Sequence, residues 1–325
     1  ALMGERALAG GDKLTILTSD RLASFGDWAE QLVAESTGKA GKGIVPIVGE
    51  PAGDPCEYGD DRTFVYLRFA DEADPAMSAL AHEEIVLEDE LAIGGEFVRW
   101  EVATAVAGIV LGIDPFDQPN VQESKDATKE LLEAYRTAGS LPQPAPAVSE
   151  PGIAGTADAA ALGATPVTVD GAVRQLLDLL QPGRDYFAIL AYLPPDPAVV
   201  ERLQRLRDRI REAYGVATTL GFGPRFLHST GQLHKGGPDT GVFLQLTADP
   251  SKDLPIPGWV ESFGTLIAAQ ALGDLASLQG RGRRALRLHL ADPDAGLGRL
   301  EAMVDAAISV GESQPRRTSA SAPRT

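Results

Sequence analysis

Three segments of the 325-residue sequence combine side chains that could move protons or hold an anion. The first is AESTGKAGKGIVP, residues 34–46, where Glu35 closes an apolar helical pattern and a Gly- and Lys-rich turn follows. Ligands of α/β proteins dock at helix ends and strand edges, so Glu35 is a candidate base. The polar side chains that could surround an anion beside it are Ser36, Thr37, Lys39 and Lys42. The alternative interpretation is a plain helix terminus with Gly38 as its cap.

The second segment is DPFDQPNVQESK, residues 114–125, which follows a long apolar stretch. Two prolines make the turn rigid, and Pro119 suits the first turn of the next helix. Such a turn could present Gln118 and Lys125 to polar groups of a substrate. The alternative is a capped turn between helices with a solvated lysine.

The third segment is FGPRFLHSTGQLHKGGPDTG, residues 222–241, a Gly-rich stretch that we expect to form a turn after a strand. It contains His228 and His234, and histidine has a free pKa suited to proton transfer near neutrality. Their spacing does not match a metal-binding pair on one helix face, and no nearby carboxylate or cysteine completes a ligand set, so we expect no metal. The other two histidines, His82 and His289, lie in apolar contexts typical of structural residues.

The elements that would position these segments follow an alternating pattern. Short apolar runs predict strands at 13–17, 43–48, 64–69, 84–89, 186–193, 216–222, 242–247 and 285–290. Longer amphipathic runs predict helices at 23–36, 95–111, 121–138, 171–180, 197–214, 265–279 and 297–310. Alternation of this kind predicts an α/β layered fold with a mainly parallel sheet, here in two lobes.

Composition divides the chain further. Residues 139–166 are rich in Pro, Ala, Gly and Ser with almost no large apolar residue, which predicts a linker or a poorly ordered excursion. We therefore expect one α/β domain over 1–138 and a second lobe over 167–311. The polar, basic residues of 312–325 predict a disordered tail.

Charge and cysteine content limit the function classes. Lys and Arg total 29 and Asp and Glu total 46, a net charge of −17, which disfavours binding to nucleic acid or anionic lipid. The single cysteine, Cys56, permits no internal disulfide and fits a reducing compartment, so we expect a cytoplasmic protein. The longest apolar run, residues 102–113, is about half of the roughly 20 residues that a membrane span needs.

Two of these segments, in longer form, resemble a known family. WAEQLVAESTGKAGKGIVPIVGEP (28–51) and EFVRWEVATAVAGIVLGIDPFDQPNVQESK (96–125) are similar to the second sugar-isomerase domain of glucose-6-phosphate isomerases. The HSTGQ element at 228–232 lies far downstream, an order that resembles the isomerase half of transaldolase fusions. The sequence begins with Ala1 inside a helical pattern, and we expect it to be a piece of something longer.

The resemblance implies interconversion of glucose 6-phosphate and fructose 6-phosphate through a cis-enediol, without a cofactor. Glu35 matches the family's base, Lys125 its active-site lysine, and His228 its ring-opening histidine by motif. The substrate-binding residues would be Ser36, Thr37, Lys39, Gln118 and Gln232. Such an enzyme would act in glycolysis, gluconeogenesis or the pentose phosphate pathway, as a homodimer or together with missing amino-terminal domains.

The sequence also departs from the family. Asn120, Val121 and Gln122 stand where the family usually has Gly-Val-Glu. A Gly-Gly-Arg element, which would supply the arginine that stabilises the enediolate, is absent from the sequence. Two alternatives therefore remain: a sugar-phosphate-binding regulatory module, although a basic helix-turn-helix is missing, and a structural lobe of a larger enzyme.

Overall fold

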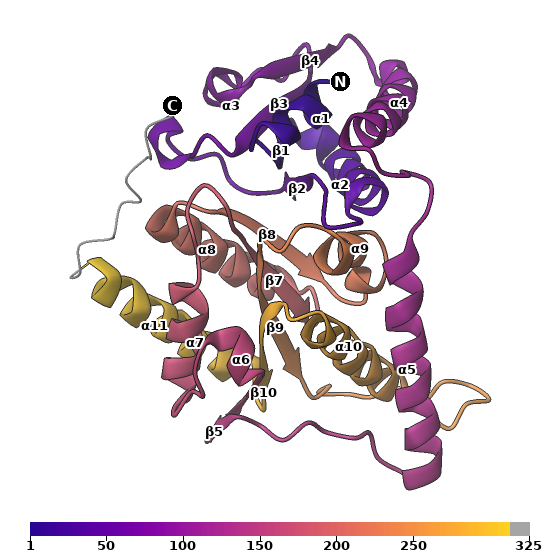
Figure 1. Cartoon of the computed structure of the whole chain (residues 1–325), viewed down its shortest axis with the longest axis vertical. Helices are drawn as coiled ribbons and strands as arrows, with labels where there is room; N and C mark the ends of the chain where they lie inside the picture. Colours follow the sequence, from indigo (N-terminus) through magenta and orange to yellow (C-terminus); the bar gives the residue numbers. More distant parts are fainter. Residues whose placement is uncertain (313–325) are drawn as a thin grey trace.

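The computed structural model describes residues 1–312, without the side chains of Phe226 and Glu312. This part of the chain forms two sheets with helices packed around them (Figure 1). The first sheet has the strand order β2-β1-β3-β4 and is parallel throughout. Its strands are β1 (Lys13–Thr18), β2 (Val45–Val48), β3 (Arg62–Phe69) and β4 (Glu83–Leu87). β1 and β3 are buried along almost their whole length, as is typical of parallel strands covered on both faces.

The helices around the first sheet pack through small and aromatic side chains. Phe25, Ala29 and Val33 recur every four residues and form the buried face of α2 (Ala23–Thr37). α4 (Ile93–Leu111) contributes Trp100 to the same core and ends at Gly112. The remaining elements are α1 (Leu2–Leu8), α3 (Pro75–Leu80) and the single turns η1 (Asp20–Leu22), η2 (Pro55–Glu57) and η3 (Glu90–Ala92).

The second sheet has the strand order β5-β6-β10-β9-β7-β8. Its four parallel strands are β7 (Tyr186–Tyr192), β8 (Ala217–Phe222), β9 (Gly241–Ala248) and β10 (Arg284–Leu290). The antiparallel strands β5 (Val148–Glu150) and β6 (Ile153–Ala157) extend it beyond β10. The predicted α/β class with mainly parallel sheets is therefore confirmed.

Helices cover both faces of the second sheet (Figure 1). One side holds the largest apolar core together with α7 (Val169–Asp178), α8 (Pro197–Tyr214) and α11 (Pro293–Glu312). The other side holds α9 (Ser229–Gly236), α10 (Phe263–Gly280) and α5 (Pro119–Ala138), which packs along α10. The short elements are α6 (Ala159–Leu162) and η4 (Arg225–Leu227).

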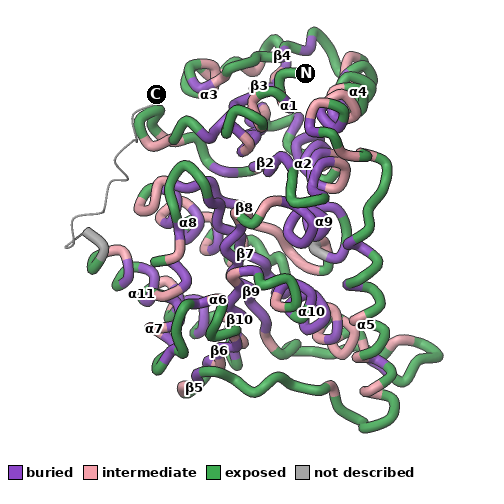
Figure 2. Tube along the Cα trace, in the orientation of Figure 1, coloured by how far each residue is buried: buried purple, intermediate pink, exposed green. Residues whose placement is uncertain are grey.

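The two sheets share one of their apolar cores. Val45 and Ile47 of β2 belong to the same buried cluster as Tyr186 and Leu190 of β7. Figure 2 shows that buried chain continues from the strands into α9, which lies between α2 and the second sheet. The lobes therefore pack against each other through residues that are as buried as those inside each lobe.

A buried ionic network reinforces this contact. Glu50, just after β2, forms an ion pair with Arg62 of β3 and accepts hydrogen bonds from Thr218 N (3.0 Å) and Thr218 Oγ1 (2.8 Å) of β8. Arg207 of α8 donates to the same threonine, from Nε to Oγ1 (3.1 Å) and from Nη2 to the carbonyl oxygen (2.7 Å). Burial opposes ionisation of Glu50, but Arg62 and Arg207 hold the pKa of its carboxyl below the ordinary value. One oxygen of this carboxylate thus bonds within the first lobe, and the other bonds to the second lobe.

The prediction of a linker over residues 139–166 is wrong for its second half. β5, β6 and α6 occupy much of residues 148–162 and extend the second sheet. At one position the packing requires a small residue, because a Cβ on Gly155 would lie 2.8 Å from the Val148 side chain. Small residues can thus belong to closely paired strands as well as to a linker, and composition alone does not distinguish the two cases.

Two further expectations need adjustment, and a third lies outside the described residues. α5 was assigned to the first lobe, but it packs along α10, so the boundary at residue 138 does not separate the packing units. The Gly-rich segment after β8 contains a buried helix, α9, instead of a turn, because Leu233 anchors it in the shared core. The tail expected over 312–325 lies outside the described residues apart from Glu312. No helix among residues 1–312 is long and apolar enough to cross a membrane.

Candidate active site

Glu35 lies in the last turn of α2, where the helix approaches α9. It is half-buried, as is Ser36. Thr37 is fully buried; its hydroxyl donates to Val33 O (2.7 Å) and accepts from Ile44 N (3.0 Å). The threonine thus ties the helix end to the chain leading into β2, which leaves the half-buried Glu35 and Ser36 as the groups a ligand could reach.

Lys39 was expected to bind substrate, but the structure places it in an internal contact. Its ammonium forms an ion pair with Asp117 Oδ1 (2.9 Å) and also donates to the Asp117 carbonyl oxygen. Lys42 makes a similar contact and donates to Leu111 O (2.6 Å). The two lysines therefore hold the turn after α2 against the end of α4 and the segment that follows it.

Gln232 of α9 connects all three segments singled out in the sequence. Its side chain is fully buried, and Nε2 donates to Gly38 O and to Asn120 Oδ1, both at 2.8 Å. Its Oε1 accepts from Asn120 N at 2.8 Å. One amide thus bonds to the turn that follows Glu35 and to the first turn of α5. Gly236 also fits closely, since a Cβ there would lie 2.3 Å from Asn120 Oδ1 and 2.7 Å from Gly38 O.

The other two candidates on the second segment face solvent. Gln118 precedes α5 as its amino-terminal flanking residue and is exposed. Lys125 is also exposed, on the second turn of α5, whereas Ser124 beside it is fully buried. The rigid turn expected around Pro119 is present, and its buried contact with α9 is made by Asn120.

His228 is exposed and stands at the start of α9. The next residue, Ser229, is buried, and its Oγ lies 3.4 Å from Gln31 Oε1 on α2. Gln31 is four residues before Glu35, so the two side chains share one face of the helix. The histidine-bearing segment is therefore packed beside the helix face that carries Glu35.

His234 has a different environment. It is buried next to the rings of Tyr186 and Phe243, with ring centroids 6.2 and 5.0 Å away. Burial lowers its pKa to about 3, assisted by the charges of Lys235 and Arg283. The imidazole is therefore neutral at physiological pH. Lys235 is also buried, in an ion pair of 2.6 Å with Asp274 of α10.

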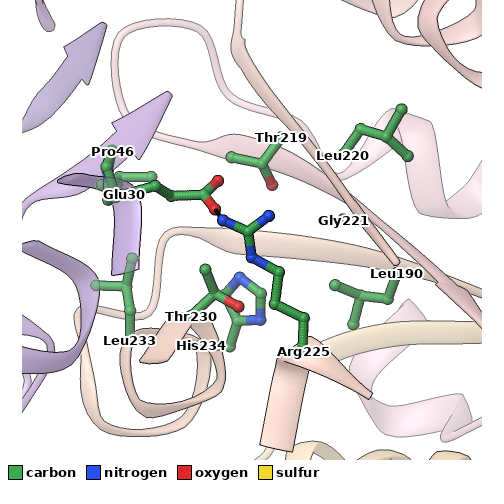
Figure 3. Close-up of a pocket in the computed structure, with 11 residues that line it drawn as sticks. Glu30, Pro46, Leu190, Thr219, Leu220, Gly221, Arg225, Thr230, Leu233 and His234 are labelled. Atoms are coloured by element: carbon green, nitrogen blue, oxygen red, sulfur yellow. Dashed lines mark ion pairs between the residues drawn. The ribbon is translucent and has the colours of Figure 1, made fainter. Parts of the chain in front are cut away.

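A pair that sequence reasoning missed, Glu30 and Arg225, lies at a cavity between the lobes (Figure 3). The Glu30 Oε2 to Arg225 Nη2 distance is 2.5 Å, and Nη2 also donates to Asp27 O (3.0 Å). Burial raises the pKa of Glu30 to about 7, although Arg225 and Arg207 oppose the shift. A signal was present in the sequence: Glu30 falls on the buried face of α2, four residues after Gly26 and three before Val33.

The cavity itself is small. It has about 20 Å³ of room for the centres of water molecules, enough for about one ordered water. β2 and β8 contribute Pro46 and Thr219 to its wall, and α9 contributes Thr230 and His234. In Figure 3 the Arg225 side chain extends toward Glu30 with Thr230 and His234 beside it. A mainly apolar cavity that contains an arginine and a carboxyl group with a pKa near neutrality is thus present beside α2.

Comparison with solved structures gives distant likenesses. No family model matches the sequence. None of the curated proteins matches it either. A crystal structure of a hypothetical protein from Thermus thermophilus overlaps 96% of this chain and 81% of its own, with 13% identity and a TM-score of 0.38. The C-terminal domain of glucosamine-fructose-6-phosphate aminotransferase from Francisella tularensis overlaps 96% of this chain and 87% of its own, with 10% identity and a TM-score of 0.29. Both likenesses are too weak to assign a family or an activity.

Proposed function

We propose that this chain catalyses the interconversion of glucose 6-phosphate and fructose 6-phosphate, with Glu35 as the base. The observation that carries the proposal is the buried amide of Gln232, which bonds to the turn after Glu35 and to the start of α5. Three segments that resemble one isomerase family in sequence are distant along the chain, and this amide joins them in space. The sugar-isomerase type of α/β fold is part of the same proposal.

The chemistry needs a base that removes the C2 proton and returns it to C1. Glu35 is half-buried at a helix end, so it has access to solvent and a fixed backbone. Positioned proton transfer of this kind contributes about 10²–10⁴-fold in rate. His228 at the start of α9 and Lys125 on α5 would assist ring opening, and both are exposed to an incoming sugar.

A second candidate function is sugar-phosphate binding without catalysis. One observation favours it: Thr37, Lys39 and Gln232 were expected to hold substrate, yet all three make internal bonds. A site whose polar groups are used for folding has fewer left to stabilise an enediolate. This module would bind the same ligand and leave its C2 proton in place.

Deuterium exchange separates the two functions. The chain is incubated in D2O with fructose 6-phosphate, and label in the sugar is measured by NMR. We expect exchange by the wild type and a loss of at least about 10²-fold in kcat for Glu35→Gln, with KM little changed. Glu101→Gln, an exposed glutamate on α4, is the matched control. Calorimetric binding without exchange would support the second function, and full activity of Glu35→Gln would remove Glu35 from its role.

A further inference from the structure

The first turn of α9 contributes a polar side chain, Thr230, to the cavity beside Arg225, and this side chain has no role in the proposed reaction. Thr230 is 9% exposed and lines the cavity, and its Oγ1 has no hydrogen-bond partner in the described part of the chain. A buried hydroxyl without a partner costs free energy, so such a group in a native site suggests a missing ligand or water.

The backbone of α9 adds donors at the same place. The helix is eight residues long and begins at Ser229 without a side-chain cap. The first amides of a helix have no intrahelical acceptor, and the helix dipole favours a negative charge there. Arg225, four residues earlier, brings a permanent positive charge to this end, and its buried Nε has no acceptor among residues 1–312. A hydroxyl, backbone amides and a guanidinium are the kinds of donor that bind an oxyanion.

The Glu30 carboxylate pairs with the guanidinium of Arg225. Its Oε2 lies 2.5 Å from Arg225 Nη2, and Asp27 Oδ1 lies 3.8 Å from Nη1. The cavity holds about one water, so an anion can bind only if the Glu30 carboxylate moves away from Arg225. The Arg225 side chain is 28% exposed, which gives a ligand access from solvent.

We propose that Arg225, Thr230 and the first amides of α9 bind the phosphate group of the substrate, with Glu30 as the internal counter-ion that this phosphate displaces. The identity of the ligand rests on the proposed function; the donor set does not. Glu30 and Glu35 are five residues apart on α2, about 7.5 Å along the axis at 1.5 Å per residue. Five residues also turn the two side chains about 140° apart around the helix at 3.6 residues per turn. A hexose 6-phosphate separates C2 from phosphorus by six bonds, and it would reach Glu35 past the start of α9, where Ser229 Oγ lies 3.4 Å from Gln31 Oε1 on the helix face of Glu35.

The proton balance of this exchange follows from the groups that face Glu30. They are Asp27 on its own helix, Arg207 on α8, Arg225 on η4 and the neutral His234 on α9. A displaced Glu30 carboxyl that stays near the bound phosphate must be neutral, because two anions cannot share one guanidinium at low cost. Since its pKa is about 7, phosphate binding takes up a proton above neutrality.

Inorganic phosphate is the probe, with calorimetric titration of the full chain at pH 6 and pH 8. We expect Arg225→Met to weaken binding at least about tenfold and Thr230→Val about threefold to tenfold. Arg225→Lys should keep part of the affinity, since it retains the charge and loses the planar fork. Arg281→Met removes an arginine paired with Glu123 on the surface and should change nothing.

Glu30→Gln tests the counter-ion role independently of phosphate's own titration. Glutamine mimics the protonated carboxyl, so this variant should bind phosphate about tenfold more tightly than the wild type at pH 8 and almost equally at pH 6. Circular dichroism and thermal unfolding establish that each variant is folded.

The possible results separate this site from the proposed function. Absence of phosphate binding by the wild type, or equal affinity in Arg225→Met and Arg225→Lys, overturns the phosphate site whatever the activity. Loss of phosphate binding in Arg225→Met together with unchanged isomerisation also overturns it as the substrate's site. Phosphate binding with the expected dependence on Arg225, in a protein that does not exchange the C2 proton, supports the site and removes the proposed isomerase function.

Discussion

Glu30 and His234 line the same cavity and have pKa values displaced by the same cause. Burial disfavours the charged form of each, which raises the pKa of Glu30 to about 7 and lowers that of His234 to about 3. Glu30 therefore changes charge within the physiological range, whereas His234 stays neutral there. Of the two groups, only the Glu30 carboxyl changes charge in this range, so only it makes the contact between α2 and η4 depend on pH.

This difference predicts a pH-dependent stability. Folded Glu30 keeps a proton that unfolded Glu30 releases above its ordinary value of 4.5, so its contribution to stability falls as pH rises from about 4.5 to 7. His234 acts in the opposite sense, because unfolded histidine takes up a proton below 6.5 and folded His234 does not. In the wild type the two contributions largely cancel between about pH 4.5 and 6.5.

Glu30→Gln should expose the histidine contribution. Relative to the wild type, the variant should gain stability as pH rises from 5 to 8, on the order of 3 kcal/mol at roughly 1.4 kcal/mol per unit of pKa shift. Urea unfolding at pH 5, 6.5 and 8 measures this. The same stability difference at all three pH values would show that Glu30 is ionised throughout, and the raised pKa would be wrong.

At the scale of helices and strands, the sequence predicted those elements whose pattern of apolar residues is local. The alternation of strands and helices is readable because β1, β3, β7 and β9 are apolar runs of strand length and α2 has one apolar face. α9 was not predicted, because three glycines, Gly231, Gly236 and Gly237, look like a turn in sequence. Gly236 is required by its close approach to Asn120 and Gly38, a contact between segments that no local pattern reveals.

The candidate site was predictable to the same extent. Glu35, His228 and Lys125 follow from short motifs, and their roles stay predictions. The pairing of Glu30 with Arg225 needs α2 and η4 to meet, which depends on how β2 packs beside β8. The helical spacing of Glu30 from Val33 fits the buried face of α2, but nothing in the sequence indicates which cation faces it.

Gln232 should be the most sensitive residue of the junction between α2, α5 and α9. Gln232→Leu roughly keeps the side-chain volume but leaves Gly38 O and Asn120 N without their hydrogen-bond partner. The expected cost is about 2–4 kcal/mol. Urea unfolding measures the loss. Gln122→Leu, which removes an exposed hydrogen bond to Asp126, should change stability by no more than about 0.5 kcal/mol. Equal effects of the two substitutions would contradict the proposed importance of the junction.

At the scale of the molecule, the lobes are coupled by the core that β2 shares with the second sheet and by the Glu50 network. Arg62→Met should cost about 3–5 kcal/mol, because it leaves the buried carboxylate of Glu50 without its ion pair. Arg174→Met, which removes an exposed pair with Asp178, should cost little.

Hydrogen exchange tests the coupling directly. Amides of β1 and β7 should open with the same free energy in the wild type, and Arg62→Met should lower both together. Separate opening of the two sheets in the wild type would show that they fold as independent domains.

The antiparallel pair β5 and β6 has a consequence for self-association. β10 is a largely buried strand whose hydrogen-bonding groups on one side are taken by β6. The strand next to β6 at the edge of the sheet, β5, has only three residues. A long, flat, apolar edge is a template for pairing with another chain, and a very short terminal strand offers little to pair with. The segment of small residues that resembles a linker in sequence thus forms this edge of the sheet. A molecule that lacked residues 148–157 would present β10 as a bare edge and be prone to form intermolecular sheets.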